Sequence, residues 1–243
     1  MAPEKISEAE TRESPSWNEW VIARSVCIIA AGIGVAVWAV RMVPGANSPL
    51  WSVLPIWVAI LVALVWSVRR EGSGSFVHDL GLRWKAVDAV TGLCCGVALA
   101  VLGIALTSLI SGRSPFGGAG FSVSSGSLPL TYWIMPIAIT LGAAALEESL
   151  FRGLIQPACI RLAESLGGKP RAANVIGISV TTVCFVACHL LLNSSGGAAS
   201  VVVLVLVSLV CGDAALVAGR VGPAFAIHAV FNVSGVVFDL IPR

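Results

Sequence analysis

The chain has 243 residues, of which 57% are hydrophobic and only 12% are charged, and its mean hydropathy is +0.92. A soluble domain of this length normally carries about 25% charged residues, so the composition excludes one and indicates a polytopic membrane protein. The net charge of +2, with no basic run, argues against nucleic acid as a partner. We therefore expect the lipid bilayer to surround most of the chain.

The apolar segments predict an all-α membrane helix bundle with about seven transmembrane helices. Residues 1–19 are polar, and we expect them to be disordered or loosely helical at the membrane surface. The expected spans lie at about 20–43, 50–68, 87–109, 128–162, 172–193, 198–218 and 224–240. The long fourth segment contains Pro136 and Pro157, and a break in it gives eight helices.

The distribution of lysine and arginine between the loops predicts the orientation. With the N-terminus inside, 11 basic residues fall on the inner side and 3 on the outer side, leaving out the intramembrane Arg152. Because cytoplasmic loops are the basic ones, we expect a multi-pass protein of the cell membrane with its N-terminus in the cytoplasm.

Three ionisable residues, Glu147, Glu148 and Arg152, interrupt the fourth apolar segment. Each costs roughly 2.5–3.5 kcal/mol near the centre of a bilayer, so each should have a partner or a function. Glu148 and Arg152 are four residues apart with the acid first, the favourable order for an ion pair on one helix. Glu147 points about 100° away from Glu148, so it has no partner on its own helix. A carboxylate that is partly removed from water and unpaired is a candidate general base. Alternatively, both acids only hold helices together.

The chain has three histidines, and two of them lie in expected spans. His78 lies in a polar loop, where we expect it to be solvated. His189 and His228 lie in the fifth and seventh spans, and Asn232 shares a helix face with His228 because it is four residues further on. A single buried histidine is often only a hydrogen-bonded core residue. Two of them, with a buried asparagine and an acid pair, favour a functional site.

The positions of these residues relative to the turns indicate whether they meet. Glu147 and His189 each lie about 20 residues from the turn at 167–168, or about 30 Å along a helix, so their heights match. His228 lies only about six residues past its own turn. It reaches the same height if the 167–168 turn projects beyond the bilayer or if the last turn is sunken.

Three short motifs in this order resemble the CPBP family of intramembrane proteases. They are Glu147-Glu148-x-x-x-Arg152, Phe185-x-x-x-His189 and His228-x-x-x-Asn232. That family includes the type II CAAX prenyl endopeptidase and bacterial bacteriocin-processing and immunity proteins. The resemblance covers roughly residues 128–239, the stretch 80–84 adds to it, and residues 1–68 contribute nothing.

The resemblance implies an intramembrane endopeptidase, a hydrolase that cleaves a peptide bond. In it, Glu147 would activate water, and His189 would position that water or bind a metal. His228 and Asn232 would stabilise the oxyanion or share in metal binding, while Glu148 and Arg152 would orient the site. The polar composition of residues 1–19 and the apolar spans divide the chain into a polar segment at 1–19 and N-terminal transmembrane helices and loops at 20–127, and the resemblance implies a catalytic core at 128–240.

The residues themselves permit two chemistries. A base that contacts water, together with donors aimed at an oxyanion, is sufficient for a peptidase. Glu147, His189 and His228 could instead hold zinc with one position open for water, as in a metalloprotease. If Glu147 binds the metal, it is less available as a base. The sequence leaves both chemistries open.

The expected substrate is a peptide or protein tail that reaches the site from the cytoplasmic side, prenylated or not. Two other functions stay open. A non-catalytic bacteriocin-immunity or scaffold protein could keep these residues as a packing network, since polar contacts between membrane helices are worth about 0.6–2 kcal/mol. A small transporter could use them to relay protons, although the chain shows no pair of matching broken helices.

Overall fold

A computed structural model describes residues 17, 20–42, 49–111, 131–192 and 197–239. Every regular element among them is helical, which confirms the all-α fold class. In chain order the elements are α1 (Trp20–Met42), α2 (Pro49–Arg70), α3 (Phe76–Asp79), α4 (Ala86–Ser111), α5 (Thr131–Leu150), the π-helical turn η1 (Phe151–Ile155), α6 (Gln156–Ser165), α7 (Pro170–Leu192), α8 (Ala198–Ala218) and α9 (Gly222–Asp239). Apart from Trp17, the expectation for residues 1–19 lies outside the described residues.

Five of these helices are long and apolar enough to cross a membrane: α1, α2, α4, α7 and α8. The apolar part of α9, Gly222–Val237, is shorter, and α5 carries both glutamates in its last turn. A multi-pass membrane protein is therefore confirmed, whereas the count of seven or eight transmembrane helices stays a prediction. The orientation of the N-terminus also stays a prediction.

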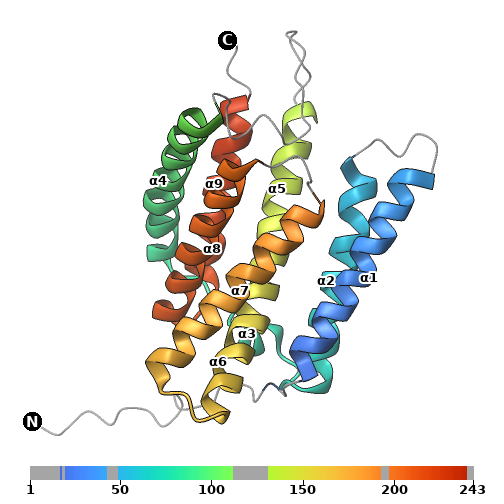
Figure 1. The fold of residues 1–243 in the computed structure, drawn as a ribbon, viewed down its shortest axis with the longest axis vertical. Helices are drawn as coiled ribbons and strands as arrows, with labels where there is room; N and C mark the ends of the chain where they lie inside the picture. Colours follow the sequence, from blue (N-terminus) through green and yellow to red (C-terminus); the bar gives the residue numbers. More distant parts are fainter. Residues whose placement is uncertain (1–16, 18–19, 43–48, 112–130, 193–196, 240–243) are drawn as a thin grey trace, which may run out of the picture.

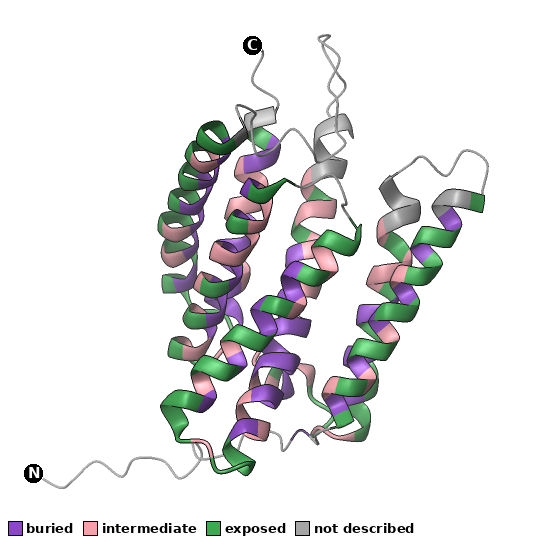
Figure 2. Cartoon of the chain, in the orientation of Figure 1, coloured by how far each residue is buried: buried purple, intermediate pink, exposed green. Residues whose placement is uncertain are grey.

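The helices form one bundle in which α9 packs against α4, α5 and α8 (Figure 1). The α1–α2 hairpin lies at one side of the bundle and contacts it mainly through α2 and α5. Buried residues concentrate on η1 and on the inward faces of α6, α7, α8 and α9, and exposed apolar residues cover the outer faces (Figure 2). This arrangement suits a lipid environment, in which outward-facing apolar side chains contact lipid rather than water.

Close packing between α4 and α9 fixes the position of His228 on α9. Gly92 and Gly96 lie one turn apart on the α4 face that contacts α9. A Cβ atom on Gly92 would lie 2.5 Å from Cβ of Ala226, and one on Gly96 would lie 2.8 Å from the carbonyl oxygen of Ile227. Small residues let membrane helices approach this closely. Larger side chains at either glycine would push away the helix that carries His228.

The helix that carries the acidic motif changes its hydrogen-bond pattern directly after it. Residues Phe151–Ile155 form a π-helical turn between α5 and α6. Pro157 explains the turn, because a proline ring inside an α-helix clashes with the carbonyl group four residues earlier, here that of Gly153. A wider turn relieves this clash, and such turns are frequent at functional sites. The fourth segment therefore stays helical through this point, and its hydrogen-bond pattern changes just before Pro157, one of the two prolines at which the sequence predicted a possible break.

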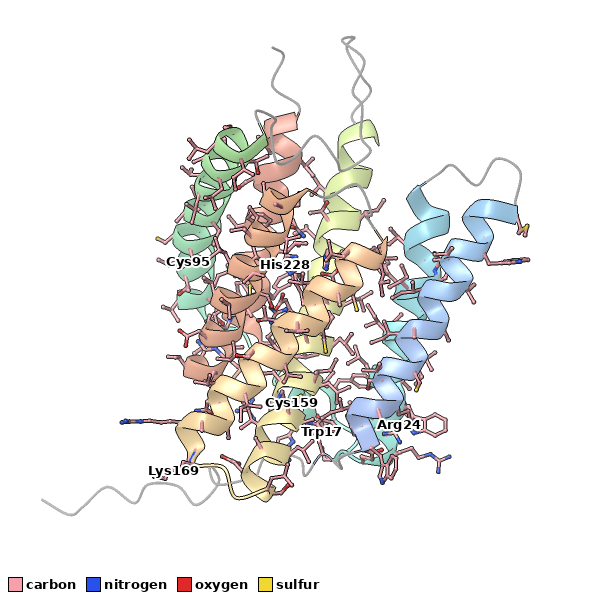
Figure 3. All side chains as sticks on the ribbon, in the orientation of Figure 1. Trp17, Arg24, Cys95, Cys159, Lys169 and His228 are labelled. Atoms are coloured by element: carbon pink, nitrogen blue, oxygen red, sulfur yellow. The ribbon has the colours of Figure 1, made fainter. Side chains whose placement is uncertain are left out.

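The turn between α6 and α7 projects beyond the turn between α8 and α9 (Figure 1). Lys169 in the first of these turns and Arg24 on α1 lie at the same end of the bundle (Figure 3). The projection is the first of the two arrangements by which the histidines could reach one height. Because of this projection, Glu147 and His189, about 20 residues from the α6–α7 turn, lie level with His228, about six residues from the α8–α9 turn.

A buried carboxylate organises the loop before α4. Asp79 accepts hydrogen bonds from Ser73 Oγ at 2.6 Å, from the Gly74 N–H at 3.1 Å and from His78 Nδ1 at 3.1 Å. Burial raises the pKa of Asp79, but these hydrogen bonds outweigh it and leave the pKa below its usual value. His78 is therefore half-buried and paired, rather than the solvated loop residue that the sequence predicted.

We expect Asp79 to make the stability of this loop depend on pH. A carboxyl group whose pKa is lower in the folded state stabilises it above the unfolded pKa of about 3.9, and the contribution is lost as pH falls through the folded pKa. The protection factors of residues 72–81, which are exchange rates corrected for the intrinsic pH dependence of amide exchange, should therefore fall below about pH 4 in the wild type. In Asp79→Asn the protection factors should already be low at pH 7 and should change little on acidification. An unchanged acid dependence in that variant would contradict this assignment.

Candidate active site

The two glutamates of the acidic motif lie at the end of α5 and face different surroundings. The Glu148 side chain is fully buried, whereas that of Glu147 is 19% exposed. Arg152, four residues after Glu148, lies in η1, and its Nη1 donates to Glu148 Oε1 at 3.0 Å. The ion pair predicted from the spacing is confirmed, and Glu147 is left free to face another group.

The imidazole of His228 is the second hydrogen-bond donor to Glu148. His228 on α9 donates from Nδ1 to Glu148 Oε1 at 2.7 Å, and its side chain is 4% exposed. The same carboxylate oxygen therefore accepts from both Arg152 and His228. Because these residues come from η1 and α9, Glu148 links the acidic motif to the last helix.

The guanidinium of Arg152 is held from its other side by α8. Its Nη2 donates to the Ser208 carbonyl oxygen at 2.9 Å and to Ser208 Oγ at 2.8 Å. The Ser208 hydroxyl in turn donates to Thr182 Oγ1 on α7 at 3.1 Å. Five elements, α5, η1, α7, α8 and α9, thus share one buried polar network, which satisfies most of its donors.

A fully buried aromatic ring separates this network from the second histidine. The centroid of Phe185 on α7 lies 5.0 Å from Arg152 Cζ, 4.3 Å from the centroid of His189 and 5.8 Å from that of His228. A cation above an aromatic face at this distance is attracted by the ring. Phe185 therefore packs against the ion pair and both imidazoles.

The hydrogen bonds of the two imidazoles determine which ring nitrogen carries the proton. His189 Nδ1 lies 2.9 Å from the carbonyl oxygen of Phe185, one turn earlier. A carbonyl oxygen and a carboxylate oxygen only accept hydrogen bonds. Both Nδ1 atoms must therefore be donors, that of His189 to Phe185 and that of His228 to Glu148. In its neutral form each ring presents an unprotonated Nε2.

Both Nε2 atoms face the same oxygen of Glu147. His189 Nε2 lies 3.7 Å and His228 Nε2 lies 3.9 Å from Glu147 Oε2. That oxygen is buried and makes no hydrogen bond within the described residues. The His228 side chain points into the bundle at mid-height (Figure 3). The structure thus brings together Glu147, His189 and His228, from α5, α7 and α9. The matching heights predicted this meeting for Glu147 and His189, whereas the height of His228 was left open.

Asn232 is the sixth residue that the sequence selected. It lies one turn beyond His228 on the same face of α9 and is half-buried. The Asn232 amide group therefore lies further from the α8–α9 turn than His228 does.

The three predicted zinc ligands converge on one point of the bundle. Among the described residues, no group of three His, Cys, Asp or Glu side chains is arranged to hold a metal ion. The separations of 3.7 and 3.9 Å are also short enough for one water to hydrogen-bond to each of these atoms. Zinc binding stays a prediction.

Comparison with known families finds a match for the part of the chain that carries this site. The family described as type II CAAX prenyl endopeptidase Rce1-like matches residues 129–234, less than half of the chain. We call these residues the Rce1-like segment, because they are similar to that family. The Rce1-like segment begins close to the start of the predicted core at 128 and contains all three motifs, so the resemblance is confirmed. No curated protein and no solved structure matches the chain.

The description of the matched family is that of an endopeptidase. The Rce1-like segment covers α5 to α9 apart from the last residues of α9, so every residue placed at the site above lies within it. Helices α1, α2 and α4 lie outside it. Nevertheless α4 packs against α9, and α2 packs against α5.

Several residues of the Rce1-like segment that build the site carry no clear signal in the sequence. Ser208 and Thr182 are isolated polar residues within apolar helices, a common occurrence in membrane proteins. Gln156 follows Arg152 by four residues, and this spacing on one helix face is the only signal that could have selected it. Phe185 is part of the Phe185-x-x-x-His189 motif, but the sequence does not show that its ring contacts Arg152.

Proposed function

We propose that this chain is an intramembrane endopeptidase in which Glu147 activates a water molecule for attack on a peptide carbonyl group. The observation that carries the proposal is the convergence of two imidazole Nε2 atoms on one carboxylate oxygen of Glu147. A base must lie within hydrogen-bond reach of the proton it removes, directly or through water. A water among these three atoms meets this requirement.

The fixed imidazoles define the remaining roles. A water between Glu147 and His189 would be oriented by His189, whose Nδ1 is held by the Phe185 carbonyl group. Once protonated, His228 would donate from Nε2 to the oxyanion, with the Asn232 amide as a second donor. Donors that are already in place when charge develops are the most effective way to stabilise such an intermediate. The proton that Glu147 takes from water would later pass to the leaving amine.

The proposed substrate is a peptide or protein tail, and the family description points to prenylated tails in particular. A prenylated tail could approach through the lipid, because the outer faces of the helices are apolar. A plain tail would approach from the end of the bundle that carries Arg24 and Lys169 (Figure 3). Neither the tail sequence nor the scissile bond follows from the geometry.

The experiment that tests this function measures metal content and cleavage on one purified sample, using isoprenylated and plain peptides. We expect the wild type to cleave at least one peptide class and His228→Ala to lose that activity, with less than 0.1 equivalent of zinc, roughly the background level, in either protein. Stoichiometric zinc in the wild type that disappears in His228→Ala would instead assign a metalloprotease. An intact wild type that cleaves no peptide of either class would contradict the proposal and favour a scaffold or immunity role.

A further inference from the structure

The polar network continues beyond the ion pair, on the side of Arg152 away from Glu147. Gln156 lies one turn after Arg152, at the start of α6, and is 3% exposed. Its Nε2 donates to the carbonyl oxygen of Gly212 on α8 at 2.9 Å. Glu148, Arg152 and Gln156 thus follow one another at four-residue intervals along one face, and α8 pairs with the last two through Ser208 and Gly212.

Three polar atoms next to this ladder are buried and make no hydrogen bond within the described residues. They are Arg152 Nε, Gln156 Oε1 and Thr181 Oγ1. Their residues are 4%, 3% and 1% exposed. The first atom is a donor, the second is an acceptor and the third is both. Buried polar groups are almost always satisfied by protein or by ordered water, so these three atoms together indicate a ligand.

The helix geometry places Thr181 beside the other two residues. The Cβ position of Gly177 on α7 lies 3.2 Å from the Gln156 carbonyl oxygen, and Phe185 lies over Arg152. Thr181 is four residues from each, so it occupies the same face of α7 between the two levels. On α8, the Cβ position of Gly212 lies 3.1 Å from Gln156 Oε1. The three unpaired atoms therefore lie on helix faces that meet in one niche among η1, α6, α7 and α8.

We propose that this niche is a binding site for one buried water molecule. The water accepts a hydrogen bond from Arg152 Nε and donates to Gln156 Oε1 and to Thr181 Oγ1. Three hydrogen bonds to otherwise unsatisfied groups is the usual environment of a buried water. Gln156 and Thr181 thereby become positioning residues, because the water fixes the guanidinium that holds Glu148, and Glu148 in turn holds His228.

Two substitutions at Thr181 separate water binding from packing. Thr181→Val keeps the shape of the side chain and removes the hydroxyl, whereas Thr181→Ser keeps the hydroxyl and removes a methyl group. If the hydroxyl binds water, valine is the more damaging change. If the side chain only fills space, serine is the more damaging change. Thr107→Val on α4 serves as the matched control, since Thr107 is a buried threonine on a helix outside the network.

The direct readout is hydroxyl-radical labelling of the full-length protein in ¹⁸O-enriched water, which marks buried side chains next to slowly exchanging waters. We expect labelling of residues 151–156 and 177–185 in the wild type and in Thr181→Ser. In Thr181→Val it should fall at least threefold, roughly the loss of one hydrogen bond, and in Thr107→Val it should not change. Equal labelling of Thr181→Val and the wild type would overturn the proposal, as would greater loss in Thr181→Ser than in Thr181→Val.

The kinetic readout rests on the proposed function, whereas the labelling does not. We expect kcat to fall about three- to tenfold in Thr181→Val with little change in KM, and to stay close to the wild-type value in Thr181→Ser. If the wild type has no peptidase activity but the labelling follows the pattern above, the water site stands and the proposed function fails. A kcat that is lower in Thr181→Ser than in Thr181→Val would count against the positioning role.

Discussion

Cleavage by the Glu147→Gln variant should be about 100- to 10,000-fold slower than by the wild type, the range that general base catalysis contributes. Glutamine keeps the size of the side chain, but its amide cannot accept a proton from water. Because Glu147 Oε2 makes no hydrogen bond within the described residues, the substitution should leave the thermal unfolding temperature nearly unchanged. Single-turnover cleavage and thermal unfolding in the same detergent would measure both effects.

The matched control for this variant is Glu164→Gln, at an exposed position on α6. It makes the same chemical change away from the site, and we expect wild-type cleavage. Glu147→Asp should retain partial activity, because it keeps the carboxylate but withdraws it from both imidazoles. A Glu147→Gln variant that loses as much stability as activity would support the packing role that the sequence left open.

Removing the charge of Arg152 should have the largest effect on stability. In Arg152→Met the fully buried Glu148 loses its ion-pair partner, and an uncompensated buried charge typically costs about 3–5 kcal/mol of unfolding free energy. The variant should therefore unfold at a much lower denaturant concentration and lose activity. Arg171→Met, at an exposed position on α7, is the matched control and should behave like the wild type.

The double variant Glu148→Gln/Arg152→Met separates stability from function. Replacing both partners of a buried pair with neutral groups often restores stability, so we expect it to be more stable than Arg152→Met alone. Activity should stay lost, because His228 no longer has a carboxylate to fix its Nδ1 proton. A double variant that is less stable than Arg152→Met, or that recovers activity, would contradict the role assigned to Glu148.

The helices themselves were largely predictable, because long apolar runs and turn residues mark their ends. The expected span at 198–218 coincides with α8, and that at 20–43 differs from α1 by one residue. The Glu148–Arg152 pair followed from helical periodicity alone. The meeting of Glu147 with His189 followed from counting residues back to their shared turn. The height of His228 did not, because it depended on how far that turn projects beyond the last one.

The partners of Arg152 on the other helices were not predictable. Helices α4 and α8 are apolar on all sides, so their sequences do not mark the face that turns inward. The rotation of α8 decides whether Ser208 faces Arg152 or lipid, and it depends on packing against α7 and α9. The π-helical turn was equally hidden, since Pro157 indicates a break nearby but not whether it takes the form of a kink, a gap or an extra residue in the turn.

The depth of Glu147 within the bundle sets a minimum length for a substrate tail. Helix α9 begins at Gly222, six residues before His228, so the site lies about 9 Å beyond the α8–α9 turn. An extended chain advances about 3.3–3.6 Å per residue. A tail that enters at this end must therefore contribute about three extended residues before a peptide bond reaches the carboxylate. The bundle would act as a ruler, sparing shorter tails and cutting longer ones at a fixed distance from the point where they enter.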